Sequence, residues 1–274
     1  MKKYIYISLI LLSFIMLSCS EYQKLLKSDD YELKYDKAIE YYNKGKYVQS
    51  QSLLDDVSPY FKGTERSPEA LYYLAMSHYG QKDYLTARDY FKTYMRLFPR
   101  GNNAAEVKYL IGHCYYLDSP DARLDQSDTN SGITALQDFI DMFPDNERVP
   151  QASKELDELN NKLAYKELLS AKLYYNLGNY LGNNYLAATI VAQNALKNFP
   201  TTTYKEDLSY VVLQAKYAQA INSVQEKSEE RYQDTIDEYY SFINEFPNGK
   251  DRAAADKIFK AASKAVGSKT SVTN

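Results

Sequence analysis

The sequence is poor in the residue types from which many enzyme sites are built. Its 274 residues include only two Cys, two His and ten Gly, and no Trp. Two Cys and two His cannot supply the ligand spacing of an ordinary zinc site. So few glycines also leave little room for loops that cradle phosphate groups. The composition therefore argues against both a metalloenzyme and a nucleotide-binding enzyme.

An excess of positive charge is also missing. Lys and Arg total 33 against 36 Asp and Glu, which gives a net charge of -3. A nucleic-acid-binding domain carries a basic footprint, so nucleic acid is not an expected partner. Hydrophobic residues make up 45% of the chain and charged residues 25%, which is typical of a globular protein. The abundant residue is tyrosine, with 29 copies.

The N-terminus has the features of a secretory signal peptide. Lys2 and Lys3 precede a mostly apolar run, Tyr4–Met16. A membrane-spanning helix needs roughly 20 apolar residues, so this run is too short to be one. The run ends in Met-Leu-Ser-Cys, which resembles the lipobox of bacterial lipoproteins with Cys19 at the modified position.

The lipobox resemblance implies cleavage before Cys19, followed by attachment of a diacylglycerol and an N-acyl chain such as palmitate. We therefore expect a signal peptide at residues 1–18, a lipidated tether at 19–30 and no other cofactor. The alternative is an ordinary signal peptide followed by a chance cysteine. With Cys19 lipidated, Cys114 is left as the one unmodified thiol. An internal disulfide is then excluded.

Everything after the tether is predicted to be helical and repetitive. From Tyr31 to about Ala265, apolar residues recur with helical period and no sustained alternation indicates strands. Four of the eight prolines follow phenylalanine, at intervals of 45, 56 and 47 residues: Phe98-Pro99, Phe143-Pro144, Phe199-Pro200 and Phe246-Pro247. Proline ends a helix, so each dipeptide marks the end of a unit.

Residues 68–99 resemble a tetratricopeptide repeat. Leu74-Ala75 and Ala87-x3-Phe91 fall where that motif places small and large residues at a helix crossing. One degenerate unit precedes it and three follow, with longer inter-helix segments at 118–130 and 178–185 and a polar stretch at 226–230.

We therefore predict an all-α, right-handed α-solenoid of about five tetratricopeptide-like helix pairs and a C-terminal capping helix, Arg252–Val266. The N-terminal half at 31–149 would contain repeats 1–3, and the C-terminal half at 150–266 would contain repeats 4–5 and the cap. A disordered tail would follow at 267–274.

The first helices of repeats 1–3 share residues spaced 37 positions apart. In each helix the members fall on one face, and in this architecture that face lines the concave groove. Tyrosine suits an extended peptide because its ring is large and its hydroxyl can bond to backbone groups. The alternative is that some of these tyrosines belong to the core, but other residues already occupy the packing positions. The predicted client-binding groove comprises Tyr35, Ile39, Tyr42, Tyr72, Met76, Tyr79, Tyr109, His113 and Tyr116, and its rim comprises Glu32, Glu69 and Glu106.

The corresponding face of repeats 4 and 5 lacks this pattern and is mildly basic. A protein whose halves have unlike surfaces is expected to hold two unlike partners. The alternative is a solvated face with no partner. The predicted partner-docking face comprises Leu168, Lys172, Tyr175, Val212 and Lys216.

Catalytic motifs are missing from the sequence. It contains no G-x-G-x-x-G, P-loop, G-x-S-x-G or H-E-x-x-H pattern. His113 and Cys114 are adjacent on a helix and point about 100° apart, so they cannot form a nucleophile–base pair. An acidic cluster at 118–128 lacks the glycine and terminal glutamate of a calcium loop. We predict that the protein is not an enzyme and binds no metal.

Taken together, the chain resembles the BamD family, the lipoproteins of the outer-membrane β-barrel assembly machinery. The resemblance rests on the lipobox, the tyrosine-rich first helices, the Phe-Pro repeat ends and the segment Lys162–Leu168 leading into Ala171–Tyr175. It implies a lipid anchor in the outer membrane, on the periplasmic side. It also implies that the N-terminal half receives unfolded outer membrane proteins and the C-terminal half holds the periplasmic domains of a BamA-like barrel protein, which would promote barrel folding and insertion. Other assembly lipoproteins are further possible partners.

Two other functions remain open. One is a different tetratricopeptide scaffold lipoprotein that serves envelope assembly in the periplasm. The other is a helical surface lipoprotein that captures glycans. Glycan binders usually stack sugars on tryptophan, and this chain has none, so the glycan reading ranks last.

Overall fold

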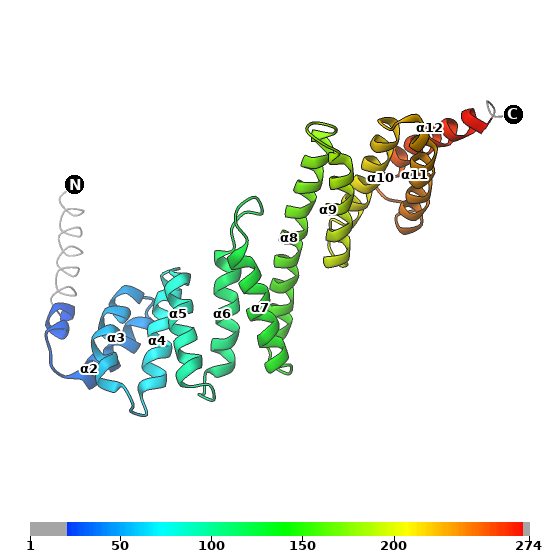
Figure 1. Ribbon diagram of the computed structural model, residues 1–274. Helices are drawn as coiled ribbons and strands as arrows, with labels where there is room; N and C mark the ends of the chain where they lie inside the picture. Colours follow the sequence, from blue (N-terminus) through cyan, green and yellow to red (C-terminus); the bar gives the residue numbers. More distant parts are fainter. Residues whose placement is uncertain (1–20, 271–274) are drawn as a thin grey trace, which may run out of the picture. The chain divides into compact units, whose positions relative to one another are not determined.

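The computed structural model describes residues 21–270 (Figure 1), so the predicted signal peptide and the predicted lipidation at Cys19 lie outside the described residues. Residues 21–270 form helices joined by turns, with no strand among them. No helix in this range has the length and apolar character needed to cross a membrane. The helices that follow the short helical segment at 21–26 are α2 (Tyr31–Asn43), α3 (Tyr47–Phe61), α4 (Ser67–Gly80), α5 (Tyr84–Leu97), α6 (Ala104–Asp118), α7 (Ser127–Met142), α8 (Val149–Leu177), α9 (Asn184–Asn198), α10 (Lys205–Ile221), α11 (Gln225–Glu245) and α12 (Arg252–Thr270).

The chain divides into two compact units. Unit 1 comprises the residues up to Ser119 together with Asp128–Glu155. Unit 2 comprises Pro120–Ser127 together with the residues from Leu156 onward. The half boundary predicted at 149/150 coincides with the start of α8, but the two units divide inside this continuous helix.

Within each unit, helices that follow one another in sequence pack against one another. In unit 1 this holds for each successive pair from α2 to α6, and in unit 2 for each successive pair from α9 to α12. Such stacking of antiparallel helix pairs is the arrangement of an α-solenoid. The predicted all-α class and the stacked helix pairs are therefore confirmed.

The Phe-Pro dipeptides mark helix ends, as predicted. Helices α5, α7, α9 and α11 each end one residue before the phenylalanine. In each case the phenylalanine N–H closes the last turn by donating to the carbonyl four residues earlier, at 2.7–2.9 Å. Each Phe-Pro connection to the next helix is six residues long: 98–103, 143–148, 199–204 and 246–251.

The connections inside each helix pair, here called the intra-pair turns, vary in length. They cover residues 44–46, 81–83, 119–126, 178–183 and 222–224. In two of them, side-chain oxygens cap the following helix: Asp83 accepts from the Thr86 N–H, and Asn183 accepts from the Leu186 N–H.

Three predicted segments differ from the structure. Part of the expected tether, residues 21–26, is helical, and Tyr22, Leu25 and Leu26 pack against the first core cluster. The polar stretch at 226–230 lies within α11 and is not a connection. The capping helix continues to Thr270, so the expected disordered tail begins within it.

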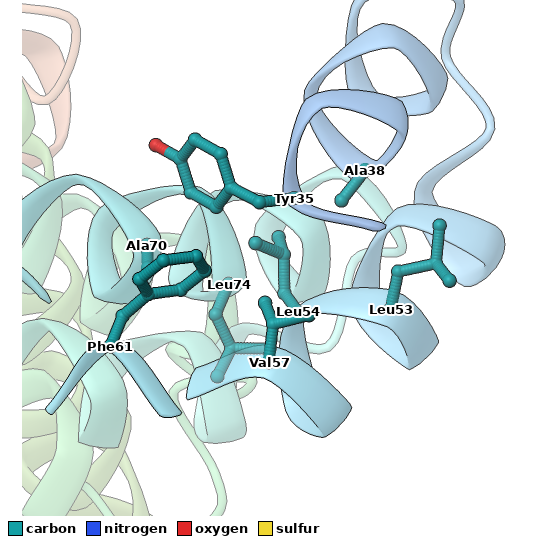
Figure 2. Close-up of a cluster of buried hydrophobic side chains, with 8 residues drawn as sticks. All are labelled: Tyr35, Ala38, Leu53, Leu54, Val57, Phe61, Ala70 and Leu74. Carbon is teal, nitrogen blue, oxygen red and sulfur yellow. The ribbon is translucent and has the colours of Figure 1, made fainter. Parts of the chain in front are cut away.

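The core of unit 1 begins with a cluster contributed by α2, α3 and α4 (Figure 2). Tyr35 lies in this cluster with Phe61 and Leu74. A fully buried apolar side chain stabilises a fold by about 1.5–3 kcal/mol. Ala75 and Ala87 are fully buried, as their predicted place at a helix crossing requires. The cluster comprises Tyr35, Ala38, Leu53, Leu54, Val57, Phe61, Ala70 and Leu74.

Gly112 lets α6 approach α7 closely. A Cβ atom added at this glycine would lie 2.7 Å from Cδ2 of Leu136, closer than real Cβ contacts allow. The glycine of the third repeat is therefore a packing residue.

Candidate functional site

The first helices of the three pairs in unit 1 carry a half-buried set of mostly aromatic residues, here called the aromatic face. Its members come from α2, α4 and α6, and each is partly accessible to solvent. They include seven of the nine residues predicted to line a groove. The aromatic face comprises Ile39, Tyr42, Tyr72, Met76, Tyr79, His113 and Tyr116.

Edge-to-face, tilted and stacked ring contacts hold the aromatic face together. Tyr42 and Tyr72 each pack against Tyr73, with ring centroids 5.1 and 5.5 Å apart. His113 lies 6.0 Å from both Tyr79 and Tyr116. These contacts join α2 to α4 and α4 to α6, and each such pair contributes about 0.5–1.5 kcal/mol beyond its buried area.

Two tyrosine hydroxyls of this face, those of Tyr72 and Tyr79, stay protonated over the physiological range. Burial, followed by the charge of Glu106, raises the pKa of Tyr72 to about 12. Burial is also the largest cause that raises the pKa of Tyr79 to about 12. Each hydroxyl can therefore donate a hydrogen bond to a carbonyl group of a bound chain.

Two of the predicted groove tyrosines belong to the core instead. Tyr35 is 5% exposed and Tyr109 is 4% exposed. Tyr35 lies over the cluster shown in Figure 2, with its ring 5.3 Å from that of Phe61. Helical spacing places these residues on the same face as Tyr72 but does not tell how deeply each is covered. The alternative reading, that some of the series is core, holds for these two.

The predicted acidic rim is largely neutralised by arginines. Glu32 forms an ion pair with Arg66, and Glu106 accepts two hydrogen bonds from Arg148, at 3.0 and 3.2 Å. Each arginine also lies over a buried tyrosine ring, Arg66 over Tyr35 at 5.1 Å and Arg148 over Tyr109 at 5.5 Å. Two of the three predicted rim glutamates therefore hold arginines over core tyrosines. The third, Glu69, is exposed, and its place in a groove rim stays a prediction.

A buried polar network lies directly beneath the aromatic face. Oε1 of Glu155 accepts from the Tyr109 hydroxyl at 3.0 Å and from the Gln151 amide at 2.8 Å. Nδ1 of His113 lies 2.9 Å from the same oxygen. Glu155 is 1% exposed. Burial alone would raise its pKa, but the hydrogen bonds from His113, Gln151 and Tyr109 outweigh burial and hold the pKa below its ordinary value.

This network fixes the position of one aromatic-face residue. His113 stacks on Tyr109 with ring centroids 5.3 Å apart, and Glu155 holds it from below. The sequence analysis assigned His113 to the groove and missed Glu155. The sequence did contain a signal for the burial of Glu155. It lies between Ala152 and Leu159 at helical spacing, on the buried side of α8.

Arg88 is a second buried charge that the sequence analysis missed. It is 5% exposed, and its guanidinium carbon lies 3.8 Å from the centroid of the Tyr115 ring. Cys114 beside it is fully buried, and burial raises the pKa of its thiol to about 12. A cavity of about 440 Å³ opens next to Tyr115, lined by Lys92, Met95, Lys108, Ile111, Tyr115, Ser131, Thr134, Ala135 and Asp138.

The acidic cluster in and beside the third intra-pair turn does not converge on one point. Asp121 and Asp125 accept hydrogen bonds from backbone N–H groups two residues ahead, and Asp128 lies 3.7 Å from Arg88. Across the described residues, no group of three His, Cys, Asp or Glu side chains is arranged to hold a metal ion.

The docking face predicted on unit 2 is only partly at the surface. Leu168 and Val212 are 2% and 1% exposed and belong to a core cluster. Lys216 is paired with Glu238 at 2.6 Å, and Lys172 lies 3.9 Å from Asp207. The face is therefore neither continuous nor a free basic surface, and its accessible members are Lys172, Tyr175 and Lys216.

Comparison with known proteins identifies relatives over most of the chain. A protein of Aquifex aeolicus that carries the name BamD is 27% identical over 231 residues, which is 82% of this chain and 72% of the relative. The outer membrane protein assembly factor BamD of Caulobacter vibrioides is 25% identical over 150 residues, 55% of this chain and 49% of the relative. A solved structure, the TPR2AB domain–pHSP90 complex of yeast Sti1, shows 13% identity and a TM-score of 0.38, covering 85% of this chain and 98% of its own.

A protein family also matches most of the chain. The model of the YfiO family, described as outer membrane lipoprotein, matches residues 28–231. This range includes the whole aromatic face and the Glu155 network of unit 1, and unit 2 as far as the first part of α11. The chain belongs to the YfiO family of outer membrane lipoproteins.

Proposed function

We propose that this protein is an outer membrane protein assembly factor, anchored by acyl chains on Cys19 at the periplasmic side of the outer membrane. In this proposal unit 1 receives unfolded barrel proteins, and unit 2 docks a BamA-like barrel protein. Membership of the lipoprotein family and the BamD names of the relatives support the general role. The aromatic face is the observation that supports client binding.

The aromatic face matches the chemistry of an unfolded barrel strand. Such strands alternate apolar and polar side chains and are flanked by aromatic residues at the membrane interfaces. The apolar side of a strand can pack on the rings of Tyr72 and Tyr79, while their hydroxyls bond to its backbone. Two or three ring contacts at about 0.5–1.5 kcal/mol each permit capture and later release.

The proposed docking of the larger partner rests on the exposed residues of α8 in unit 2. Lys172 and Tyr175 remain accessible from the predicted face, and Leu173 on the same helix is 59% exposed. An exposed apolar residue beside a tyrosine and a lysine is a composition suited to a protein interface.

The client-binding proposal is tested with the double substitution Tyr72→Ala and Tyr79→Ala. Both rings are partly exposed, so we expect folding to persist while affinity for a peptide that mimics a C-terminal barrel strand falls at least tenfold, or about 1.4 kcal/mol. Peptide affinity is measured by fluorescence anisotropy, and helicity by circular dichroism.

Tyr240→Ala is the matched control. This tyrosine lies in α11 of unit 2 and is 48% exposed, so its removal deletes a comparable ring outside the aromatic face. Its peptide affinity should match that of the unsubstituted protein. Unchanged affinity in the double variant would mean that clients bind elsewhere, and equal losses in both variants would mean that the peptide binds tyrosines nonspecifically.

A further inference from the structure

The fourth intra-pair turn of the chain, residues 178–183 in unit 2, projects large apolar side chains into solvent. Leu181 is 90% exposed and Tyr180 is 68% exposed. Leu177, at the end of α8 just before the turn, is 40% exposed. Single exposed apolar residues are normal, but a tyrosine and a leucine together at the apex of one turn are not explained by the packing of unit 2.

Backbone conformation and hydrogen bonds fix the shape of this turn. Leu181 has a φ of 54°, a conformation that costs an ordinary L-residue about 1–2 kcal/mol. Positive φ values at Gly178 and Gly182 make the tight path possible. The Asn184 side chain donates to the Tyr180 carbonyl at 2.7 Å, and the Asn184 N–H donates to the Gly178 carbonyl at 3.0 Å. These two hydrogen bonds of Asn184 hold the base of the turn, and the apolar apex faces solvent.

The surroundings of the apex are electrically neutral. The segment Leu173–Leu196 contains no Asp, Glu, Lys or Arg, in a chain of which 25% is charged. The other complete intra-pair turn of unit 2, residues 222–224, also exposes apolar side chains, because Val224 within it and Ile221 before it are 62% and 53% exposed. Unlike the apex, it is followed at once by charged residues of α11, beginning with Glu226 and Lys227. Helices α8 and α10 both run toward these turns, so the two turns lie at one edge of unit 2.

Corresponding turns in unit 1 are charged. The first is Lys44-Gly45-Lys46 and the second is Gln81-Lys82-Asp83. The third turn, most of which belongs to unit 2, is also charged, with Asp121, Arg123 and Asp125. The apolar apex is therefore a property of the fourth turn and not a general feature of these turns.

We propose that the turn edge of unit 2 contacts an uncharged lipid surface, with Tyr180 and Leu181 entering the headgroup region. The absence of cations from Leu173–Leu196 means that anionic lipid is not needed for the contact. Tyrosine is favoured at membrane interfaces, and an aliphatic side chain beside it reaches the acyl boundary, about 5–10 Å deep for interfacial elements. A lipid bilayer is expected close to the protein, because the chain belongs to a family of outer membrane lipoproteins. The proposal does not depend on client capture by unit 1.

The test uses the full chain bound to phosphatidylcholine vesicles that carry a quencher on the lipid acyl chains. Leu181→Cys is labelled with an environment-sensitive fluorophore. Leu85→Cys is the matched control, because Leu85 is 57% exposed and follows a charged turn of unit 1. The unsubstituted chain measures background labelling, which buried Cys114 with its raised thiol pKa should not contribute.

The expected result is a shift to shorter wavelength and loss of fluorescence at position 181, with neither change at position 85. Adding Tyr180→Asp to the labelled Leu181→Cys chain should abolish both changes. High salt should not alter them. Unquenched fluorescence at 181, or quenching that requires anionic lipid, would overturn the proposal. A wavelength shift that occurs only when a partner protein is added, and without lipid quenching, would assign the apex to a protein pocket instead.

Discussion

The two units differ in what they bury. Among the described residues, the buried Lys34, Arg88 and Glu155 all lie in unit 1. The core of unit 2 combines aliphatic side chains with the rings of Tyr239 and Phe242. It also contains small residues that are fully buried, such as Ala171, Ala192 and Ala215. A buried charge must keep its partners in fixed positions, whereas alanine allows helices to approach closely. Unit 1 therefore holds part of its aromatic set with buried charges, whereas the described residues of unit 2 bury no Lys, Arg, Asp or Glu.

Among substitutions that test this difference between the units, Glu155→Ala is expected to cause the largest loss of stability. The substitution removes the acceptor shared by Tyr109, His113 and Gln151. Removing one member of a buried, hydrogen-bonded group costs about 3 kcal/mol. Hydrogen exchange followed by mass spectrometry should show faster exchange in unit 1, with α10 and α11 of unit 2 unchanged.

Glu147→Ala serves as the control for this prediction. Glu147 is exposed just before α8, so its loss should change stability by less than about 0.5 kcal/mol. Equal exchange rates in Glu155→Ala and the unsubstituted protein would show that the network contributes little to unit 1.

A somewhat smaller effect is expected from Ala192→Leu in unit 2. Ala192 is fully buried in the cluster that contains Leu168 and Val212, so three added carbon atoms must displace neighbouring side chains. Overpacking of this kind costs about 1–3 kcal/mol. Urea unfolding measures the loss, and Asn194→Leu, at an exposed position of the same helix, should leave the transition nearly unchanged. Full stability of Ala192→Leu would contradict the role assigned to small residues.

The smallest expected effect is a loss of stability of unit 1 at acidic pH. The pKa of Glu155 is held below its ordinary value of 4.5, so its contribution to stability is present above that pH. The contribution is lost as pH falls through the lower pKa of the folded state, by about 1.4 kcal/mol for each unit of depression. Hydrogen exchange from pH 7 to pH 3 should detect the loss in unit 1, and Glu155→Gln should flatten this part of the profile. A flat profile in the unsubstituted protein would contradict it.

The helical architecture was predictable because its signals are local. Each Phe-Pro dipeptide combines a residue that closes a helix with one that cannot continue it, and all four helices end there. The start of α12 at Arg252 was predicted for the same reason. The extent of α8 was harder to predict, because after Pro150 in its first turn no proline or glycine marks a boundary before Leu177.

The candidate site was predicted less well because burial depends on distant segments. Spacing alone placed Tyr35, Tyr72 and Tyr109 on equivalent positions of three helices. Arg66 and Arg148 cover the first and last of these tyrosines from positions in the connections to later helices. The sequence pattern within α2 or α6 does not show that these arginines cover the two rings. The sequence therefore could not distinguish the core tyrosines from Tyr72.

The constant length of the four Phe-Pro connections has a consequence for how this chain can change during evolution. One inserted residue at that edge would rotate the next helix by about 100° and turn its apolar side away from its neighbour. The intra-pair turns carry no such restriction, and their lengths already differ, from 44–46 to 119–126. Insertions and deletions are therefore expected to accumulate in the intra-pair turns and not in the Phe-Pro connections, so new contacts can arise at these turns while the stacking register is inherited intact.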